Sequence, residues 1–271
     1  MPPADPPRSF RRALALGLIQ GPTELLPISS SAHTRLIPWL AGWDEDAPGR
    51  DEDRSFEVVL HGAACLALAL EMAGPLRRDL PGASARSALT AAFAVGIPAL
   101  AGLTLRGHLQ QHLSGARATA GGLVAGALGM ALADRLAPSG GRSADDAGPL
   151  DGLMLGLAQT LALAPGVSRN GATLTAARAR GFARPAAQRL SWGAGLPVMA
   201  GASASEAVRA AREGTVGERR ALTAGALGAF FSTRLGARLL AGPLERGPLW
   251  PYSLYRALLA ALILVSARRA Q

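Results

Sequence analysis

This sequence of 271 residues has no lysine and only one cysteine. A single cysteine excludes an intrachain disulfide framework, and no zinc-ligand motif accompanies it. Charged residues make up only 17% of the chain, whereas soluble domains average about a quarter. Because 49% of the residues are hydrophobic, a disordered chain, which combines low hydrophobicity with high charge, is excluded as well. The composition therefore predicts a polytopic membrane protein.

All of the positive charge comes from arginine, and the formal net charge is +9. The arginines occur singly or in pairs at the ends of apolar runs, as Arg11 with Arg12 and Arg268 with Arg269. This placement is typical of membrane flanks and differs from the continuous basic stripe that follows a nucleic-acid backbone. We therefore expect contacts with membrane lipids and no nucleic-acid partner.

Two apolar stretches, 13–34 and 152–176, are interrupted in the middle by Pro, Gly and Ser. The interruptions predict two re-entrant pairs of short helices within a single membrane-embedded domain, 10–271, after a disordered Pro-rich tail, 1–9. Broken backbone at membrane depth is tolerated only where protein or water surrounds it, so both breaks indicate a functional site. Aromatic residues near the ends of apolar stretches are expected among the lipid head groups: Trp39, Trp43, Trp192, Trp250, Tyr252 and Tyr255.

The two broken stretches also resemble each other. The sequence Gly-Leu-Ile-Gln at 17–20 returns as Gly-Leu-Ala-Gln at 156–159, and at the same offset Ser29 falls on Ser168. An offset near half the chain length is typical of a duplicated unit. We predict an all-α inverted repeat with halves at about 10–138 and 150–271, each a re-entrant pair followed by about three transmembrane helices.

Loop charges bear on the orientation of this fold. The loops 77–86 and 178–189 are rich in arginine, which favours the cytoplasmic side, and the second has no acidic residue. The arginines at both termini argue for the opposite orientation, because the repeat would place both termini outside.

The first break contains Gln20, Glu24, Ser29, Ser30 and His33. A spacing of four places Gln20 and Glu24 on one helix face, and a serine after Pro27 can cap the next helix. His33 lies three residues after Ser30, so both are expected to face one cavity. Taken singly, each residue is more often structural, but a carboxylate within a membrane segment costs about 2.5–3.5 kcal/mol unless it is paired or hydrated.

The second break runs from Pro165 to Thr173 and reads Pro-Gly-Val-Ser-Arg-Asn-Gly-Ala-Thr. Glycines allow close backbone approach, amides opening a helix after Asn170 can point at an anion, and Arg169 offers a planar fork for phosphate oxygens. The alternative is a simple turn beside an arginine that snorkels to the interface. If the two breaks meet tip to tip in one polar pocket, they suit a diphosphate.

Because Glu24 would repel phosphate, this arrangement also implies a divalent cation, Mg²⁺ or Ca²⁺, between them. His61 lies on an apolar run and is expected to be a buried core histidine, with a second contact to the diphosphate as the alternative. Cys65 is expected in the core.

Both breaks resemble the signature motifs of the undecaprenyl-diphosphatase family, also known as bacitracin-resistance proteins. Phe56–His61, Leu190–Met199 and Tyr255-Arg256 follow in the order typical of that family, so the likeness covers nearly the whole chain. The resemblance implies an enzyme of the bacterial inner membrane that opens to the periplasm. It would remove the terminal phosphate of undecaprenyl diphosphate, a polyprenyl lipid, and so recycle the carrier for cell-wall synthesis.

The resemblance also implies roles for individual residues. Gln20 and Glu24 would hold the metal, and Ser30 and His33 are candidates for nucleophile or proton transfer, with water attack as the third possibility. Glu24 and Arg169 complete the catalytic set. The diphosphate would be bound by Ser29, Ser168, Arg169, Asn170, Gly171 and Thr173.

Three positions depart from the family pattern: Gln20 stands where Glu is frequent, Asn170 where Ser is usual, and Ala32 where Gly is common. Gln20 removes a negative charge from the metal site, and Asn170 removes a hydroxyl. Two other hypotheses therefore stay open: a transporter of a lipid phosphate or anion on the same repeat, and a catalytically silent relative. The sequence does not decide between a monomer and a homo-oligomer.

Overall fold

The computed structural model describes residues 10–43, 51–79, 84–113, 115–138, 140–213 and 215–269. These residues form helices joined by short turns, with one isolated β-bridge between Arg142 and Phe182 and no strand in the described ranges. The prediction of an all-α protein is confirmed. The predicted tail, 1–9, lies outside the described residues.

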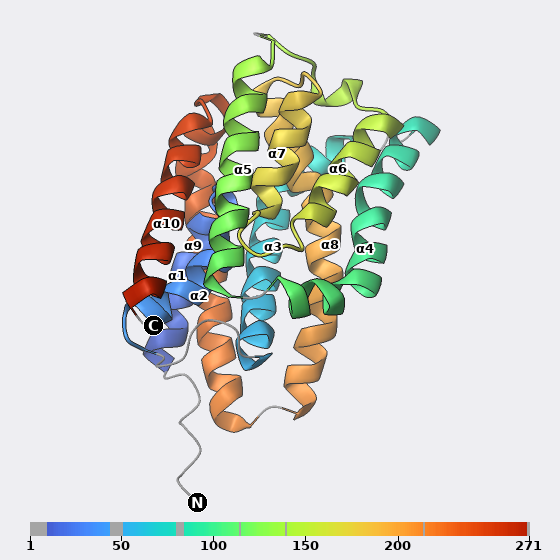
Figure 1. Cartoon of the computed structure of the whole chain (residues 1–271). Helices are drawn as coiled ribbons and strands as arrows, with labels where there is room; N and C mark the ends of the chain where they lie inside the picture. The colour runs from blue at the N-terminus through green and yellow to red at the C-terminus, as the bar shows by residue number, and fades with distance from the viewer. Residues whose placement is uncertain are drawn as a thin grey trace, which may run out of the picture.

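Both broken stretches form pairs of short helices, as the interruptions predict. Helices of 16, 11, 13 and 11 residues are too short to cross a bilayer, which takes about 20 residues. Figure 1 shows the second pair in the upper half of the molecule and the first pair in the lower half. The first pair is α1 (Phe10–Leu25) with α2 (Ser30–Leu40), and the second is α6 (Pro149–Leu161) with α7 (Arg169–Ala179).

Three long helices follow each short pair in the described ranges. Four stretches are long and apolar enough to cross a membrane: Phe56–Gly74, Ala85–Leu105, Ala116–Leu136 and Trp250–Arg268. Large apolar side chains on their outer faces are exposed, including Leu103 at 87%, as expected for contact with lipid. The chain is a multi-pass membrane protein. The long helices are α3 (Asp51–Asp79), α4 (Ala85–His112) and α5 (Ala116–Leu136), then, after the short 3₁₀ helix η2 (Ala144–Asp146), α8 (Arg184–Glu213), α9 (Val216–Arg246) and α10 (Trp250–Arg269).

Each short pair packs against the other half of the chain: α1 lies on α9, and α6 lies on α4. A Cβ on Gly17 would lie 2.1 Å from the Gly225 carbonyl oxygen, and one on Gly156 would lie 2.4 Å from that of Phe93. These two glycines are the ones that the repeated sequence aligns. These glycines thus let α1 approach α9 closely and α6 approach α4 closely.

Trp250 is 59% exposed at the start of α10, whereas the expectation of a position among the head groups is wrong for Trp192. Trp192 is 6% exposed and packs with Leu25 and Leu68, because its position on α8 lies beside the end of α1 and not at a helix terminus.

Cys65 is buried and donates its thiol hydrogen to the Leu196 carbonyl, which confirms its place in the core.

Candidate active site

The tips of the two short helix pairs share an unusual backbone conformation. Ser29 has φ 72° and Ser168 has φ 67°, and no other non-glycine residue in the described ranges has a positive φ. Side chains other than glycine rarely adopt this region, so the surrounding structure must hold it in place. Each serine is the N-cap of its second helix, which was expected for Ser29 only, and α7 begins at Arg169, earlier than the predicted start after Asn170.

The two tips meet, as the hypothesis of a single polar pocket requires. Arg169 Nη2 donates to Glu24 Oε1 at 2.5 Å, and Asn170 Nδ2 donates to the Leu25 carbonyl at 2.7 Å. Both contacts join residues 145 positions apart in the sequence. A buried carboxylate from one half of the chain therefore holds the guanidinium of the other half.

Glu24 is the centre of a hydrogen-bond network and is only 5% exposed. Its Oε2 accepts from Ser30 Oγ at 2.8 Å and from Gln20 Nε2 at 3.1 Å, and lies 2.8 Å from His61 Nδ1. The predicted common face of Gln20 and Glu24 is thus confirmed. A charge at this depth is tolerated because Arg169 and polar donors surround it.

A second carboxylate extends the network from α3. His61 Nε2 lies 3.6 Å from Glu57 Oε1, and Arg35 donates to Glu57 Oε2 through Nε at 2.9 Å and Nη2 at 2.7 Å. The imidazole of His61 thus bridges Glu57 and Glu24. The expectation of a core histidine is wrong, because this side chain is 23% exposed and lines the cavity described next.

A cavity of about 300 Å³ lies where the tips meet. Its polar wall includes Glu24, Ser30 and Arg169, and its remaining wall is apolar and extends to the turn between α4 and α5. Such a shape suits a molecule with an anionic head and a hydrocarbon tail. The other polar residues that line it are Thr23, Ser29, Ser31, Arg35, Glu57, His61, Thr119, Ser168, Asn170 and Ser203, and the apolar ones include Leu36, Leu109, Leu113, Val198 and Met199.

Four predicted site residues do not line this cavity: Gln20, His33, Gly171 and Thr173. His33 Nδ1 donates to the Ser29 carbonyl at 2.8 Å, so in the neutral ring Nε2 accepts from the Tyr255 hydroxyl at 2.6 Å. The two rings are stacked. The expectation that Ser30 and His33 face one cavity is wrong, because Tyr255 holds the imidazole on the side toward α10.

Thr173 and Asn170 join α7 to its neighbours. The Thr173 hydroxyl is fully buried and lies 2.5 Å from Ser191 Oγ, and Asn170 Oδ1 accepts from the same serine at 2.6 Å. Asn170 thus connects α8 to the end of α1, because its amide nitrogen reaches Leu25. A serine side chain is too short to make both contacts, which gives a physical reason for asparagine at this position.

Arg256 on α10 is the main residue that the sequence reasoning did not place in the site. Its side chain is fully buried and reaches both tips, donating to Pro27 of the first at 3.3 Å and to Gly166 and Val167 of the second at 3.0 and 2.8 Å. It is the only charged residue between Trp250 and Val265, and a lone charge in such a run is a functional signal. Its remaining acceptors are the carbonyls of Gly122 and Leu123.

Comparison with known proteins supports the family resemblance that the two motifs indicate. A family model described as "Bacitracin resistance protein BacA" matches residues 13–262. The chain belongs to this family. Curated BacA-family relatives named undecaprenyl-diphosphatase include those of Geobacter sulfurreducens, 37% identical over 93% of this chain and 96% of the relative, and Thermomicrobium roseum, 38% identical over 94% and 96%. The relative of that name in Idiomarina loihiensis is 34% identical over 94% of this chain and 97% of its own length.

Gln20 and Glu24 are the residues predicted to hold a divalent cation in this BacA-family site, and the Gln20 amide nitrogen donates to Glu24 Oε2. Gln20 Oε1 is buried without a hydrogen-bond partner, and the Glu24 carboxylate lies one helical turn away. No group of three or more His, Cys, Asp or Glu residues gathers in the described ranges. Mg²⁺ is usually bound by one or two carboxylates, water and substrate phosphates, so a sparse protein contribution suits a cation that arrives with a diphosphate.

Proposed function

We propose that the chain hydrolyses undecaprenyl diphosphate to undecaprenyl phosphate and inorganic phosphate. The observation that carries this proposal is the Arg169–Glu24 contact inside a cavity with one anion-binding wall and one apolar wall. Arg169 lines the cavity, and its Nη1 is buried without a hydrogen-bond partner, so one donor of its guanidinium group is unsatisfied. The names of the BacA-family relatives supply the specific lipid.

Ser30 is the nucleophile that the geometry favours. Its hydroxyl donates to Glu24 Oε2 at 2.8 Å, the distance expected between a nucleophile and its base. As Ser30 Oγ bonds to the terminal phosphorus, the bond from phosphorus to the bridging oxygen breaks and undecaprenyl phosphate leaves. The serine proton passes to Glu24, and water then hydrolyses the phosphoserine to inorganic phosphate. Arg169 would stabilise the charge on the transferring group, while His33 would only orient the Ser29 backbone.

Gln20 and Glu24 would hold a divalent cation together with the substrate diphosphate. When bound, the cation would offset the negative charge of the phosphates beside Glu24. Ser29 and Ser168 line the cavity beside Arg169 and would contact the same diphosphate, while Asn170, Gly171 and Thr173 would keep Arg169 in place from behind.

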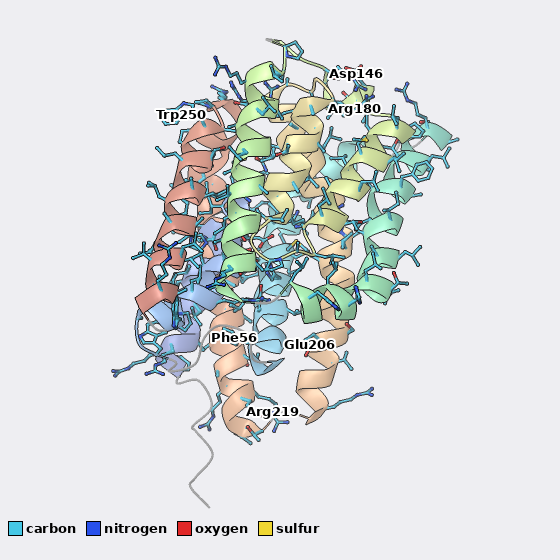
Figure 2. All side chains as sticks on the ribbon, viewed as in Figure 1. Phe56, Asp146, Arg180, Glu206, Arg219 and Trp250 are labelled. Atoms are coloured by element: carbon cyan, nitrogen blue, oxygen red, sulfur yellow. The ribbon has the colours of Figure 1, made fainter. Side chains whose placement is uncertain are left out.

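The same proposal includes an inverted repeat whose active site opens to the periplasm. The matching contacts of Gly17 and Gly156 with the opposite half support the repeat, as do the matching φ angles of Ser29 and Ser168. The arginine-rich turn after α7, with Arg180, lies at the end of the molecule away from the turn between α4 and α5 that the cavity reaches (Figure 2). An arginine-rich turn favours the cytoplasm, which leaves the cavity on the periplasmic side.

We expect the purified full-length protein to release inorganic phosphate from a long-chain polyprenyl diphosphate, and we expect a chelator to abolish that release. Adding back Mg²⁺ or Ca²⁺ in excess of the chelator should restore it. Release that persists in chelator would contradict the cation proposal alone. No release under any of these conditions would contradict the proposed function, and lipid transport by the same protein in vesicles would then favour the transporter hypothesis.

Gly195 gives a test of the position of Arg169. A Cβ at Gly195 would lie 1.9 Å from Arg169 Nη1, so Gly195→Ala must displace the guanidinium. We expect about a tenfold loss of kcat/KM for phosphate release, since small displacements of catalytic groups are costly. Gly193→Ala on the same helix is the matched control, because a Cβ there meets no atom within 4 Å. Equal losses in the two variants would mean that the position of Arg169 is not limiting.

A further inference from the structure

A second cavity lies at the other end of the molecule from the candidate active site. It is open to the surface, has a volume of about 800 Å³, and is lined by the end of α5, the start of α8 and the turn from α9 to α10. Figure 2 places Trp250, which lines it, at the same end as Asp146 and Arg180, and Arg219 at the opposite end. Its charged lining residues are Asp134, Arg135, Arg178, Arg184 and Arg246.

The lining of this cavity has an excess of positive charge. Asp134 is the one carboxylate among its lining residues, and it is already paired: Arg178 Nε donates to it at 2.9 Å and Arg184 Nη2 at 2.9 Å. Arg135 and Arg246 have no hydrogen-bond or ion-pair partner among the residues that the structure describes. Four guanidinium groups thus face one carboxylate, which makes the cavity a strong attractor for an anion.

The depth of the cavity indicates where this anion comes from. The membrane-crossing stretch of α5 ends at Leu136 and that of α10 begins at Trp250, and the two helices pack against each other. Both ends border the cavity, so it lies at the level of the lipid head groups. Directly below it, the outer faces of these helices expose Leu132 at 59% and Leu254 at 52%. An apolar strip therefore continues from the basic cavity into the membrane.

We propose that this cavity binds the phosphate head group of an anionic phospholipid, with its acyl chains lying along α5 and α10. Arg135 and Arg246 would contact the phosphate oxygens, because a guanidinium fork pairs with phosphate through two hydrogen bonds. Asp134 holds Arg178 and Arg184 in place, and these two side chains form the wall behind Arg135 and Arg246. Basic pockets between helices at the membrane surface bind such head groups, and the exposed Trp250 suits the same layer. This proposal does not depend on the hydrolysis reaction.

The test uses the purified full-length protein in a zwitterionic detergent, titrated with phosphatidylglycerol or phosphatidylcholine and examined by native mass spectrometry. We expect phosphatidylglycerol to be retained in preference to phosphatidylcholine. The double variant Arg135→Gln with Arg246→Gln should weaken retention of phosphatidylglycerol by roughly tenfold to thirtyfold, because each surface arginine contributes about a factor of five. The matched control is Arg219→Gln with Arg220→Gln, which removes the same charge from exposed residues at the opposite end.

The outcomes separate the possible ligands. Selective retention that is lost in the first double variant and kept in the control supports the proposal. Equal retention of the two lipids, or equal losses in the two double variants, overturns it. If inorganic phosphate at the lipid concentration displaces phosphatidylglycerol completely, the ligand is a free anion and the lipid assignment is wrong. Monodisperse elution and an unchanged melting temperature of each variant exclude misfolding as the cause.

Discussion

Replacing Arg169 by alanine is expected to lower kcat for phosphate release by about 10²–10³-fold, the effect of removing one preorganised group that stabilises transition-state charge. Arg169 is held by Glu24 at one edge of its fork, and the other edge is buried without a partner. In the proposed reaction, the charge on the transferring phosphoryl group would grow beside Arg169. Arg169→Lys keeps the charge but loses the planar fork, so it should recover only part of the activity.

Glu24→Gln should reduce kcat to a similar extent, because it removes the proposed base for Ser30, leaves Arg169 without its carboxylate and leaves His61 with Glu57 alone. Since Glu24 and Arg169 act as a unit, the double variant should lose little more than either single variant. Initial rates of phosphate release at several substrate concentrations give kcat and KM for each variant. Arg86→Ala is the control, because this exposed arginine contacts the Asp146 carbonyl at the other end of the molecule. A wild-type kcat in folded Arg169→Ala protein would remove this residue from the mechanism.

Local features of the sequence were sufficient to predict the two pairs of short helices. Proline, glycine and serine at the breaks stop and restart helices for reasons that do not depend on the rest of the fold. The spacing of Gln20 and Glu24 likewise fixes a common face within one helix. The meeting of Glu24 with Arg169 was predicted only as a hypothesis, because it depends on how α1 packs on α9 and α6 on α4.

The histidines show where local reasoning fails. His33 and Ser30 are three residues apart on one helix, yet their side chains point to different neighbours, because the Tyr255 hydroxyl on α10 donates to His33 Nε2. His61 comes from α3 and reaches Glu24 across the helix interface, which no spacing within one segment reveals. The signal that was available is chemical: Glu57 and His61 are polar residues one turn apart in an apolar stretch.

Arg256→Met is expected to lower kcat about 100-fold and to destabilise the protein by roughly 3 kcal/mol, because it leaves several buried carbonyls without their donor. Arg256 is the one side chain among the described residues that donates to carbonyls in both tips, at Pro27 and at Gly166 and Val167. Without Arg256, the two tips are no longer fixed relative to each other. Ser30, the proposed nucleophile, then no longer faces the guanidinium group of Arg169. The effect should fall on kcat more than on KM, because the apolar wall that holds the lipid tail is unchanged.

A milder variant separates the positioning role of Arg256 from a purely structural one. A Cβ at Gly126 would lie 2.0 Å from Arg256 Nη2, so Gly126→Ala should shift the guanidinium while keeping its charge buried. Gly121→Ala on the same helix is the control, because a Cβ there meets no atom within 4 Å. We expect kcat to fall in Gly126→Ala and partial recovery in Arg256→Lys, whose ammonium reaches only some of the carbonyls. If melting temperatures fall in these variants while kcat per folded molecule stays at the wild-type value, Arg256 only stabilises the fold and does not position the two tips.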